Sequence, residues 1–280
     1  MSTEIFLLVL LAAFLHAGWN VLIKLNADRL VSLTVLQSLM GLLGLAMVAW
    51  FGLPSQLSLK FALVSGFLHM GYNLFLVRAY KTADLSQTYP IARGTAPLLT
   101  LLGAWVALND VPSLIAMIAI LMLVLGLLLT AFGNSSSAVH DPHAVFYALG
   151  TACFIAVYTL VDGQGARHSG NAFGYAGVVF VLDGLFMLIA SMVLRGPGIV
   201  AELLPHWRHG FVGALASGAA YAIVIWAMTE VPIASVAALR ETSIVFVLLM
   251  SARVLREALT WQRVGGGLLI VAGAVVLRLA

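Results

Sequence analysis

An arginine buried in an apolar segment constrains this chain more than any other feature. The segment Leu85–Leu108 carries no charge except Arg93 and is long enough to cross a bilayer as a helix. Arg93 lies eight residues from its start, and so about 12 Å deep at ~1.5 Å per residue of helix. A guanidinium at that depth costs at least ~2.5–3.5 kcal/mol unless it is paired or faces water. Arg240, followed by Glu241, repeats the feature 147 residues later in another apolar segment, so we expect both arginines to serve a purpose.

Composition identifies the class of protein. Of the 280 residues, 62% are hydrophobic and only 9% are charged, whereas soluble chains carry about 25% charged residues. The mean hydropathy of +1.07 agrees with a multi-pass protein of the cell (inner) membrane. The net charge of +3 is spread over short loops without a basic cluster, so no nucleic-acid partner is expected. Cys153 is the only cysteine, which excludes an intrachain disulfide and a cysteine-based metal site, and we expect no metal or other cofactor.

Ten apolar segments have about the length that a transmembrane helix needs. Helices are expected because no alternating β pattern is present and a helix satisfies its own backbone hydrogen bonds in lipid. The first segment has no basic residues before it, so we interpret it as a retained span and not as a signal peptide. The sequence therefore predicts an all-α polytopic membrane protein with ten transmembrane helices, at Ile5–Leu25, Val31–Phe51, Leu59–Ala79, Leu85–Leu108, Val111–Phe132, Ala144–Val161, Ala172–Leu194, Gly210–Met228, Ile233–Leu255 and Leu259–Leu279.

The chain divides into two halves that repeat. Residues 133–143 are polar and rich in turn formers, which predicts a linker loop between a first five-helix repeat at 1–132 and a second at 144–280. At a constant offset of 147 residues the coinciding pairs are Gly66/Gly213, Gly71/Gly218, Thr82/Thr229, Arg93/Arg240, Thr95/Thr242 and Gly126/Gly273. An odd number of spans per repeat inverts the second copy. Inverted repeats are typical of secondary transporters, whose substrate site lies near the membrane midplane between the repeats.

The distribution of Lys and Arg over the short loops predicts the orientation. One side of the membrane would carry nine of these residues: Lys24, Arg29, Arg78, Lys81, Arg195, Arg208, Arg253, Arg256 and Arg263. The other side, which holds both termini, would carry three: Lys60, Arg167 and Arg278. Because the cytoplasmic side carries the excess, both termini are expected outside.

Two local motifs give the chain a family resemblance. The first segment contains His16-Ala17-Gly18-Trp19-Asn20, and Arg256-Glu257-Ala258-Leu259-Thr260-Trp261-Gln262 leads into a glycine-rich last segment. With its two repeats of five helices, the chain resembles the drug/metabolite transporter superfamily, EamA type, over essentially its whole length. The first half departs from the second motif, since Asp110 replaces the glutamate and Pro112 follows. The resemblance implies transport of a small metabolite, often export, and fixes no substrate.

The two arginines leave several roles open. Their planar guanidinium groups could bind an anionic substrate group such as a carboxylate or a phosphate. Arg93 could instead pair with Glu241 across the repeat interface and lock the two halves together. As neighbours on one helix, Arg240 and Glu241 point apart, so they are not expected to pair with each other. A third hypothesis makes the ion pair a gate or a proton-linked switch.

Further polar residues are candidates for a central cavity. His16 and Asn20 share one helical face near the midplane, and Trp19 lies beside them. Tyr158 aligns with Trp19 when the first segment is overlaid on the sixth, and Tyr89 shares a face with Arg93. The remaining candidates for the substrate site are Asn73, Tyr221 and, more weakly, Tyr72, together with Arg93, Arg240 and Glu241.

Three ionisable side chains are candidates for carrying a coupling proton. His16, Asp183 and Glu241 each lie inside an apolar segment, where an ionisable side chain marks a functional site by default. Each also has a purely structural explanation, namely a hydrogen bond between helices or to the backbone. Asp162 falls just beyond a predicted segment, where we expect it to reach toward the interface.

These observations favour a secondary active transporter for a small polar or anionic metabolite such as an amino or organic acid, and the resemblance implies an exporter. Alternating access would move the substrate, with protons as an optional coupling partner, and nothing in the sequence requires more than a monomer. No GxxxxGK[ST] loop is present to bind ATP, so a gradient must drive it. The alternatives are a channel or a non-transporting membrane subunit. An intramembrane enzyme is disfavoured, because no catalytic motif stands out.

The charge bias predicts that a reporter enzyme fused to the C-terminus is active outside the cytoplasm. The physical reason is the excess of Lys and Arg in the loops on the opposite side. Activity of matched periplasmic and cytoplasmic reporters measures the orientation. A fluorescent C-terminal fusion that matures in the cytoplasm would contradict the orientation and leave the number of helices unaffected.

Overall fold

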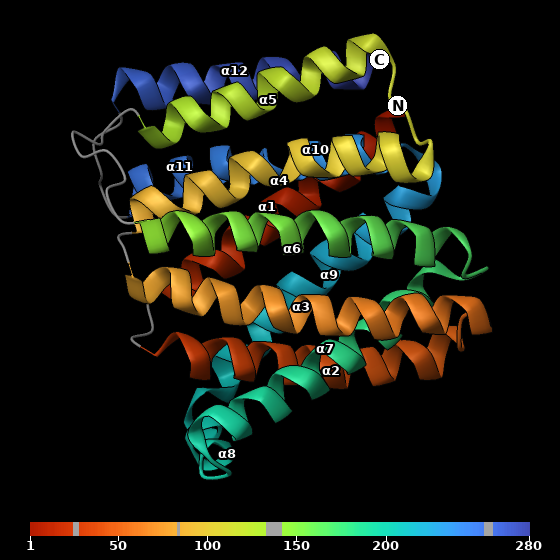
Figure 1. Cartoon of the computed structure of the whole chain (residues 1–280), viewed down its shortest axis with the longest axis vertical. Helices are drawn as coiled ribbons and strands as arrows, with labels where there is room; N and C mark the ends of the chain where they lie inside the picture. Colours follow the sequence, from red (N-terminus) through yellow and green to blue (C-terminus); the bar gives the residue numbers. More distant parts are fainter. Residues whose placement is uncertain (25–27, 83–84, 133–141, 255–259) are drawn as a thin grey trace.

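The computed structural model describes the backbone of residues 1–24, 28–82, 85–132, 142–254 and 260–280. For residues 21–24, 79–82, 85–90, 131–132, 144, 251 and 254 the description covers the backbone alone. In this part of the chain every regular element is a helix (Figure 1). The elements are α1 (Thr3–Lys24), α2 (Arg29–Phe51), α3 (Gln56–Thr82), α4 (Leu85–Leu108), α5 (Leu114–Phe132), α6 (Pro142–Arg167), α7 (Ala172–Arg195), α8 (Ile199–Leu203), the 3-10 helix η1 (Leu204–His206), α9 (Trp207–Glu230), α10 (Ile233–Arg240), α11 (Ser243–Val254) and α12 (Trp261–Leu279).

Long apolar helices confirm the predicted polytopic membrane fold. Among the described residues, nine segments are long and apolar enough to cross a bilayer, and the apolar helix Leu114–Thr130 within α5 is shorter. Large apolar side chains such as Leu42, Phe67 and Leu268 are more than half exposed. Exposed apolar surface on this scale is typical of helices that are surrounded by lipid.

The ninth predicted span is present as the apolar segment Ile233–Met250, but its helix is interrupted and not continuous as expected. The chain leaves the α-helix after Arg240 and resumes it at Ser243. At the break, the N–H groups of Glu241 and Thr242 donate to the carbonyl oxygens three residues earlier, at 3.0 and 3.1 Å. The Thr242 hydroxyl donates to the Leu239 carbonyl oxygen at 2.7 Å, and such side-chain bonds compete with the regular helical pattern. The break lies directly beside the arginine that the sequence singles out.

Two helix boundaries also differ from the predicted ones in a way that matters for the site. The sixth helix was predicted to end at Val161, but α6 continues to Arg167. Asp162 is therefore inside the helix and fully buried, so its expected place at a helix end was wrong. The fifth helix begins at Leu114 and not at Val111, because Ser113 caps it, with the Ala116 N–H donating to the Ser113 hydroxyl at 3.2 Å.

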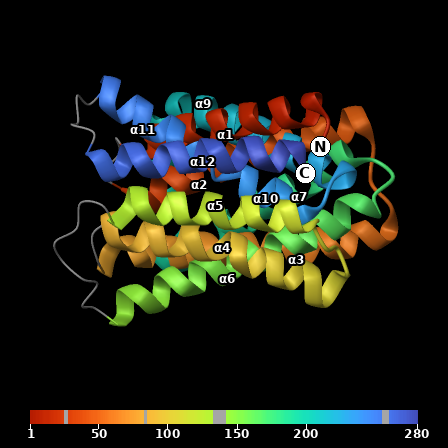
Figure 2. The ribbon, with the colours of Figure 1, turned by 90° about the horizontal axis from the view of Figure 1, so that it is seen from above.

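The helix packing repeats itself when the two halves are exchanged. Matching helices pack on each other in two places, α2 against α7 and α5 against α12 (Figures 1 and 2). The contact of α3 with α6 has its counterpart in α9 with α1, and α4 with α6 has its counterpart in α10 and α11 with α1. A pseudo-twofold relation between the repeats produces this pattern. The exact limits of the repeats stay a prediction, and residues 133–141 of the predicted linker lie outside the described residues.

Small residues bring α5 and α12 into close contact. A Cβ atom on Gly126 would lie 2.7 Å from the carbonyl oxygen of Gly266, and one on Gly273 would lie 3.0 Å from that of Ala119. The repeat offset of 147 converts the first of these two pairs into the second. Close approach at small residues is a usual means of joining helices in lipid, where no hydrophobic force drives them together.

Replacing Gly266 by alanine should lower the thermal unfolding midpoint of the purified protein. The added Cβ would come within 2.6 Å of the Gly126 carbonyl oxygen and of the Thr130 side chain. Overpacking of this kind costs about 1–3 kcal/mol.

The neighbouring Gly265 provides a matched control, because a Cβ there would meet no heavy atom within 4 Å. Gly265→Ala should be neutral or slightly stabilising, since alanine is the better helix former by ~0.8–1.0 kcal/mol. Intrinsic fluorescence during heating in detergent measures both midpoints. Equal midpoints for the two variants would contradict the close contact.

Candidate functional site

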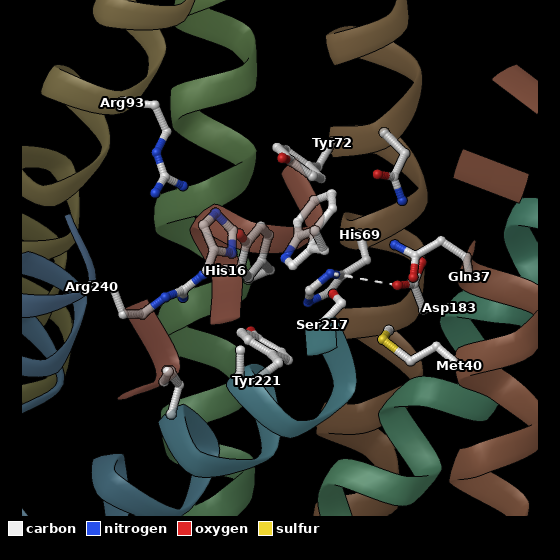
Figure 3. A pocket seen from close by; sticks show the side chains of 16 residues that line it. His16, Gln37, Met40, His69, Tyr72, Arg93, Asp183, Ser217, Tyr221 and Arg240 are labelled. Carbon is white, nitrogen blue, oxygen red and sulfur yellow. Dashed lines mark ion pairs between the residues drawn. The ribbon is translucent and has the colours of Figure 1, made fainter. Parts of the chain in front are cut away.

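A polar cavity lies between the two repeats, near the middle of the surrounding helices (Figure 3). The space open to the centres of water-sized spheres is about 50 Å³. Each water needs ~10–15 Å³ of this measure, so the cavity holds a few water molecules. Its polar and aromatic lining comes from both repeats: His16, Trp19, Gln37, His69, Tyr72, Asn73, Arg93, Tyr158, Asp183, Ser217, Tyr221 and Arg240.

The two arginines lie on one side of this cavity, in different surroundings (Figure 3). Arg93 forms an ion pair with Glu241, with 3.0 Å between Nε and Oε2, and its Nη2 donates to the Ser243 hydroxyl at 3.4 Å. Both partners are at the break between α10 and α11, so the pair joins α4 of the first repeat to the second repeat. Arg240 instead lies over the ring of Tyr221, with 5.2 Å between Cζ and the ring centroid.

The different partners of the arginines follow from sequence differences between the repeats. At the offset of 147, the counterpart of Glu241 is Gly94 and the counterpart of Ser243 is Ala96. The first repeat therefore has no acid or hydroxyl at the places from which the second repeat binds Arg93. Arg240 lines the cavity, and no acid stands beside it at the place where Glu241 stands beside Arg93.

The opposite side of the cavity holds Asp183 and Gln37, whose side-chain oxygens lack hydrogen-bond partners among the described residues (Figure 3). Asp183 is 1% exposed, and neither of its carboxylate oxygens has a hydrogen-bond partner among the described residues. Within the same part of the chain, the side-chain oxygen of Gln37, both amide atoms of Asn73 and Nε1 of Trp19 lack partners too. An unpaired buried polar group costs about 1–3 kcal/mol. Because all four side chains line the cavity, water or a bound ligand would supply the missing hydrogen bonds.

A hydrogen-bonded cluster adjoins the cavity beside Asp183. Asp162 of α6 accepts from the hydroxyl groups of Tyr175 at 2.9 Å and Tyr221 at 2.5 Å. His69 of α3 lies between the two aspartates, with Nε2 3.2 Å from Asp162 Oδ2 and Nδ1 3.8 Å from Asp183 Oδ2. The imidazole also stacks on Tyr158 at a centroid distance of 4.0 Å. The cluster thus joins α3 of the first repeat to three helices of the second.

Sequence reasoning missed His69 and misplaced Asp162. His69 had a usable signal, because it lies inside an apolar segment as His16 does, and an ionisable residue there marks a functional site by default. Asp162 was placed at a helix end because the sixth apolar segment was predicted to stop one residue earlier, at Val161.

Most of the predicted substrate-site residues do meet at the cavity. Its lining includes His16, Trp19, Asn73, Arg93, Tyr158, Tyr221 and Arg240, and also the predicted proton carrier Asp183. Asn20 lines a smaller adjoining pocket with His16 and Arg93, and its amide donates to the His16 carbonyl oxygen at 2.8 Å. Glu241 is buried next to Arg93 and does not line the cavity. The side chain of Tyr89 lies outside the described residues.

Several hydrogen bonds lie at the end of the bundle that carries both termini, and those of Asp110 connect the two repeats (Figure 1). Arg167, at the end of α6, donates to Asp110 at 3.0 Å and to the carbonyl oxygens of Met228 and Val231 at 2.9 and 3.1 Å. Asp110 also accepts from the N–H of Ile233, the first residue of α10, at 3.0 Å. These contacts fasten the α4–α5 and α9–α10 connections to α6.

Comparison with known proteins agrees with this architecture. The model of the EamA-like transporter family matches residues 3–132 and again residues 143–279. A solved structure described only as "Crystal structure of protein" shares the fold, with a TM-score of 0.75 and 19% sequence identity over 100% of this chain and 98% of that one. No curated protein matches the sequence significantly. The two matches of the family model together cover nearly the whole chain, and the protein therefore belongs to the EamA-like transporter family.

Proposed function

We propose that this transporter is a secondary active carrier that exports a small metabolite bearing a carboxylate and an ammonium group, such as an amino acid. The observation that carries the proposal is the separation of charge across the cavity. Arg240 lies on one side, and Asp183, whose oxygens have no hydrogen-bond partner among the described residues, lies on the other (Figure 3). A dipolar ligand satisfies both ends at once, whereas a simple organic acid, the alternative substrate, would use the arginine side alone.

The arginine side suits a carboxylate. A guanidinium presents two parallel N–H donors that match the two oxygens of a carboxylate. The ring of Tyr221 lies beneath Arg240 and restricts its orientation, as cation–π contacts do. Arg93 already has Glu241 and Ser243 as partners, so we assign the main carboxylate contact to Arg240 and a supporting role to Arg93.

The acceptor side suits an ammonium group. Asp183 and Gln37 present oxygens that lack donors among the described residues. An ammonium carries three N–H donors and a positive charge, so it would supply hydrogen bonds and balance the carboxylate of Asp183. Trp19 Nε1 and the Asn73 amide remain available for other polar atoms of the substrate.

The bonds of Asp110 support alternating access over an open pore. Asp110 of the first repeat accepts from Arg167 and from the N–H of Ile233, which both belong to the second repeat, at the end of the bundle where both termini lie. For the repeats to separate on that side, these bonds must break. Rocking of one repeat against the other around a central site is the usual motion of inverted-repeat carriers. A channel or a non-transporting subunit would not require bonds between the repeats that can break and form again.

Arg240→Lys should raise the half-saturation concentration for substrate by roughly tenfold or more. A hydrogen bond to a charged group contributes about 1.5–3 kcal/mol, and 1.4 kcal/mol corresponds to tenfold. Counterflow into proteoliposomes, tested with amino acids, organic acids, phosphonates and organic cations, first identifies a transported compound and then measures the variant.

Arg208→Lys is the matched control, because Arg208 lies at the start of α9 over the ring of Trp207, away from the cavity. It should transport as the unchanged protein does. Flux that rises linearly with concentration for every compound would favour a channel. Saturable counterflow that Arg240→Lys leaves unaltered would contradict the assigned carboxylate contact.

Arg93→Met and Glu241→Gln should each destabilise the protein, because each leaves one buried charge without its partner. Breaking a buried ion pair in this way costs roughly 3–5 kcal/mol. The double variant should recover most of the loss in thermal midpoint, since no uncompensated charge remains. Transport by the double variant separates the two hypotheses for Arg93. Normal substrate affinity would make Arg93 a structural lock, and weaker affinity would support its role beside Arg240.

A further inference from the structure

The two buried aspartates near the cavity have opposite surroundings. Asp162 is 0% exposed. It accepts from the hydroxyl groups of Tyr175 and Tyr221, and Nε2 of His69 lies at hydrogen-bond distance from it. Asp183 is 1% exposed and has no hydrogen-bond partner among the described residues. A carboxylate is an acceptor only, and the hydroxyl groups of Tyr175 and Tyr221 donate to Asp162 in that form.

The contact with Asp162 fixes the tautomer of His69. Because Asp162 is an acceptor, Nε2 of the imidazole carries the hydrogen at their 3.2 Å contact. In a neutral ring Nδ1 is then an acceptor, and it lies 3.8 Å from Asp183 Oδ2. Two acceptors facing each other in a buried site repel. One proton, on Nδ1 or on Asp183, turns this contact into an attraction.

The net charge of the groups around His69 and Asp183 allows one more proton to bind. The titratable groups that face it are Tyr158 and Asp162 from α6, Tyr175 from α7, Tyr221 from α9 and Arg240 from α10, with His16 of α1 further along the cavity. From α2 the cavity receives only the uncharged Gln37 and Met40. With His69 neutral, the two aspartates and Arg240 sum to one negative charge. One bound proton makes the group neutral.

We propose that His69 and Asp183 together hold one exchangeable proton, and that the ammonium group of the substrate displaces it from this pair. In this exchange an N–H of the ammonium replaces the proton as partner of Asp183, and the proton leaves to water in the cavity. Asp162 is a positioning residue, which acts by holding His69. The inference deepens the proposed function, because an exporter that binds either a proton or its substrate can be driven by inward movement of protons.

The proton site can be tested without any substrate. Infrared difference spectra of the purified protein between acid and alkaline pH should show carboxyl or imidazole bands from the pair. Asp183→Asn and His69→Gln should each remove the same titrating signal, because neither residue holds the proton alone. Glu202→Gln and His209→Gln are the matched controls, since both residues are exposed in the segment from α8 to α9, and they should leave it unchanged.

Different results in the spectra would overturn the proposal. A titration that persists in both Asp183→Asn and His69→Gln would place the proton elsewhere, and loss in only one of them would end the shared site. Asp162→Asn should move the titration and keep its amplitude, because it alters the position of His69 and not the proton carriers. Size-exclusion chromatography identifies any variant that fails to fold. If one of Asp183→Asn and His69→Gln does not fold, the infrared titration of the other variant is the test.

Transport gives the second readout, with whichever amino acid shows saturable counterflow in the unchanged protein as the probe. Asp183→Asn should retain counterflow at higher half-saturation concentration but lose accumulation driven by a pH gradient. His69→Gln should likewise lose the accumulation. Accumulation that survives in both variants would overturn the coupling role. If no amino acid is transported at all, the proposed function fails, and the infrared titration still decides whether the proton site exists.

Discussion

A bilayer offers no water to a buried polar group, and this constraint organises the whole structure. Each ionisable side chain in the middle of the bundle must meet a partner or face the cavity. Two clusters have partners: Arg93 pairs with Glu241, and Asp162 contacts two tyrosines and His69. Both clusters join helices of different repeats. The remaining ionisable groups face the cavity and form part of its wall. Interactions that are complete hold the bundle together, and those that are incomplete are where a ligand can bind.

Close packing at glycines occurs in both the apolar and the polar parts of the bundle. Where α5 meets α12, glycines allow the backbones to approach closely. Beside the cavity, α2 and α7 also approach closely, because a Cβ atom on Gly184 would lie 2.5 Å from the Gln37 carbonyl oxygen. The polar cluster depends on such a glycine as well, because a Cβ atom on Gly165 would lie 2.3 Å from the Tyr175 hydroxyl that donates to Asp162. A residue without a side chain is thus a requirement of the polar cluster.

The fold could be predicted from the sequence because it depends on properties that are summed over many residues. Apolar length and the 147-residue repeat do not depend on any single contact, so the helical bundle and the importance of Arg93 and Arg240 could be inferred. The break after Arg240 could not, because residues 240–243 include no glycine or proline that would announce it, and the bond of Thr242 to Leu239 appears only in three dimensions. His69 and Asp162 acquire their meaning from each other across 93 positions of sequence. The lining by Gln37 likewise depends on how α2 is rotated against α7.

The polarity of the cavity arises where the repeats depart from their symmetry. Duplication alone would give two equivalent arginines related by the pseudo-twofold relation, and a cavity with two equal ends. Glu241 and Ser243 neutralise and hold Arg93, whereas Gly94 and Ala96 occupy the matching places near Arg240. Arg93 thereby becomes part of the contacts that join the repeats, whereas Arg240 has no acid at the matching place. With Asp183 opposite Arg240, a nearly symmetric scaffold has a positive and a negative end, and the dipolar ligand that we propose would bind it in one orientation only.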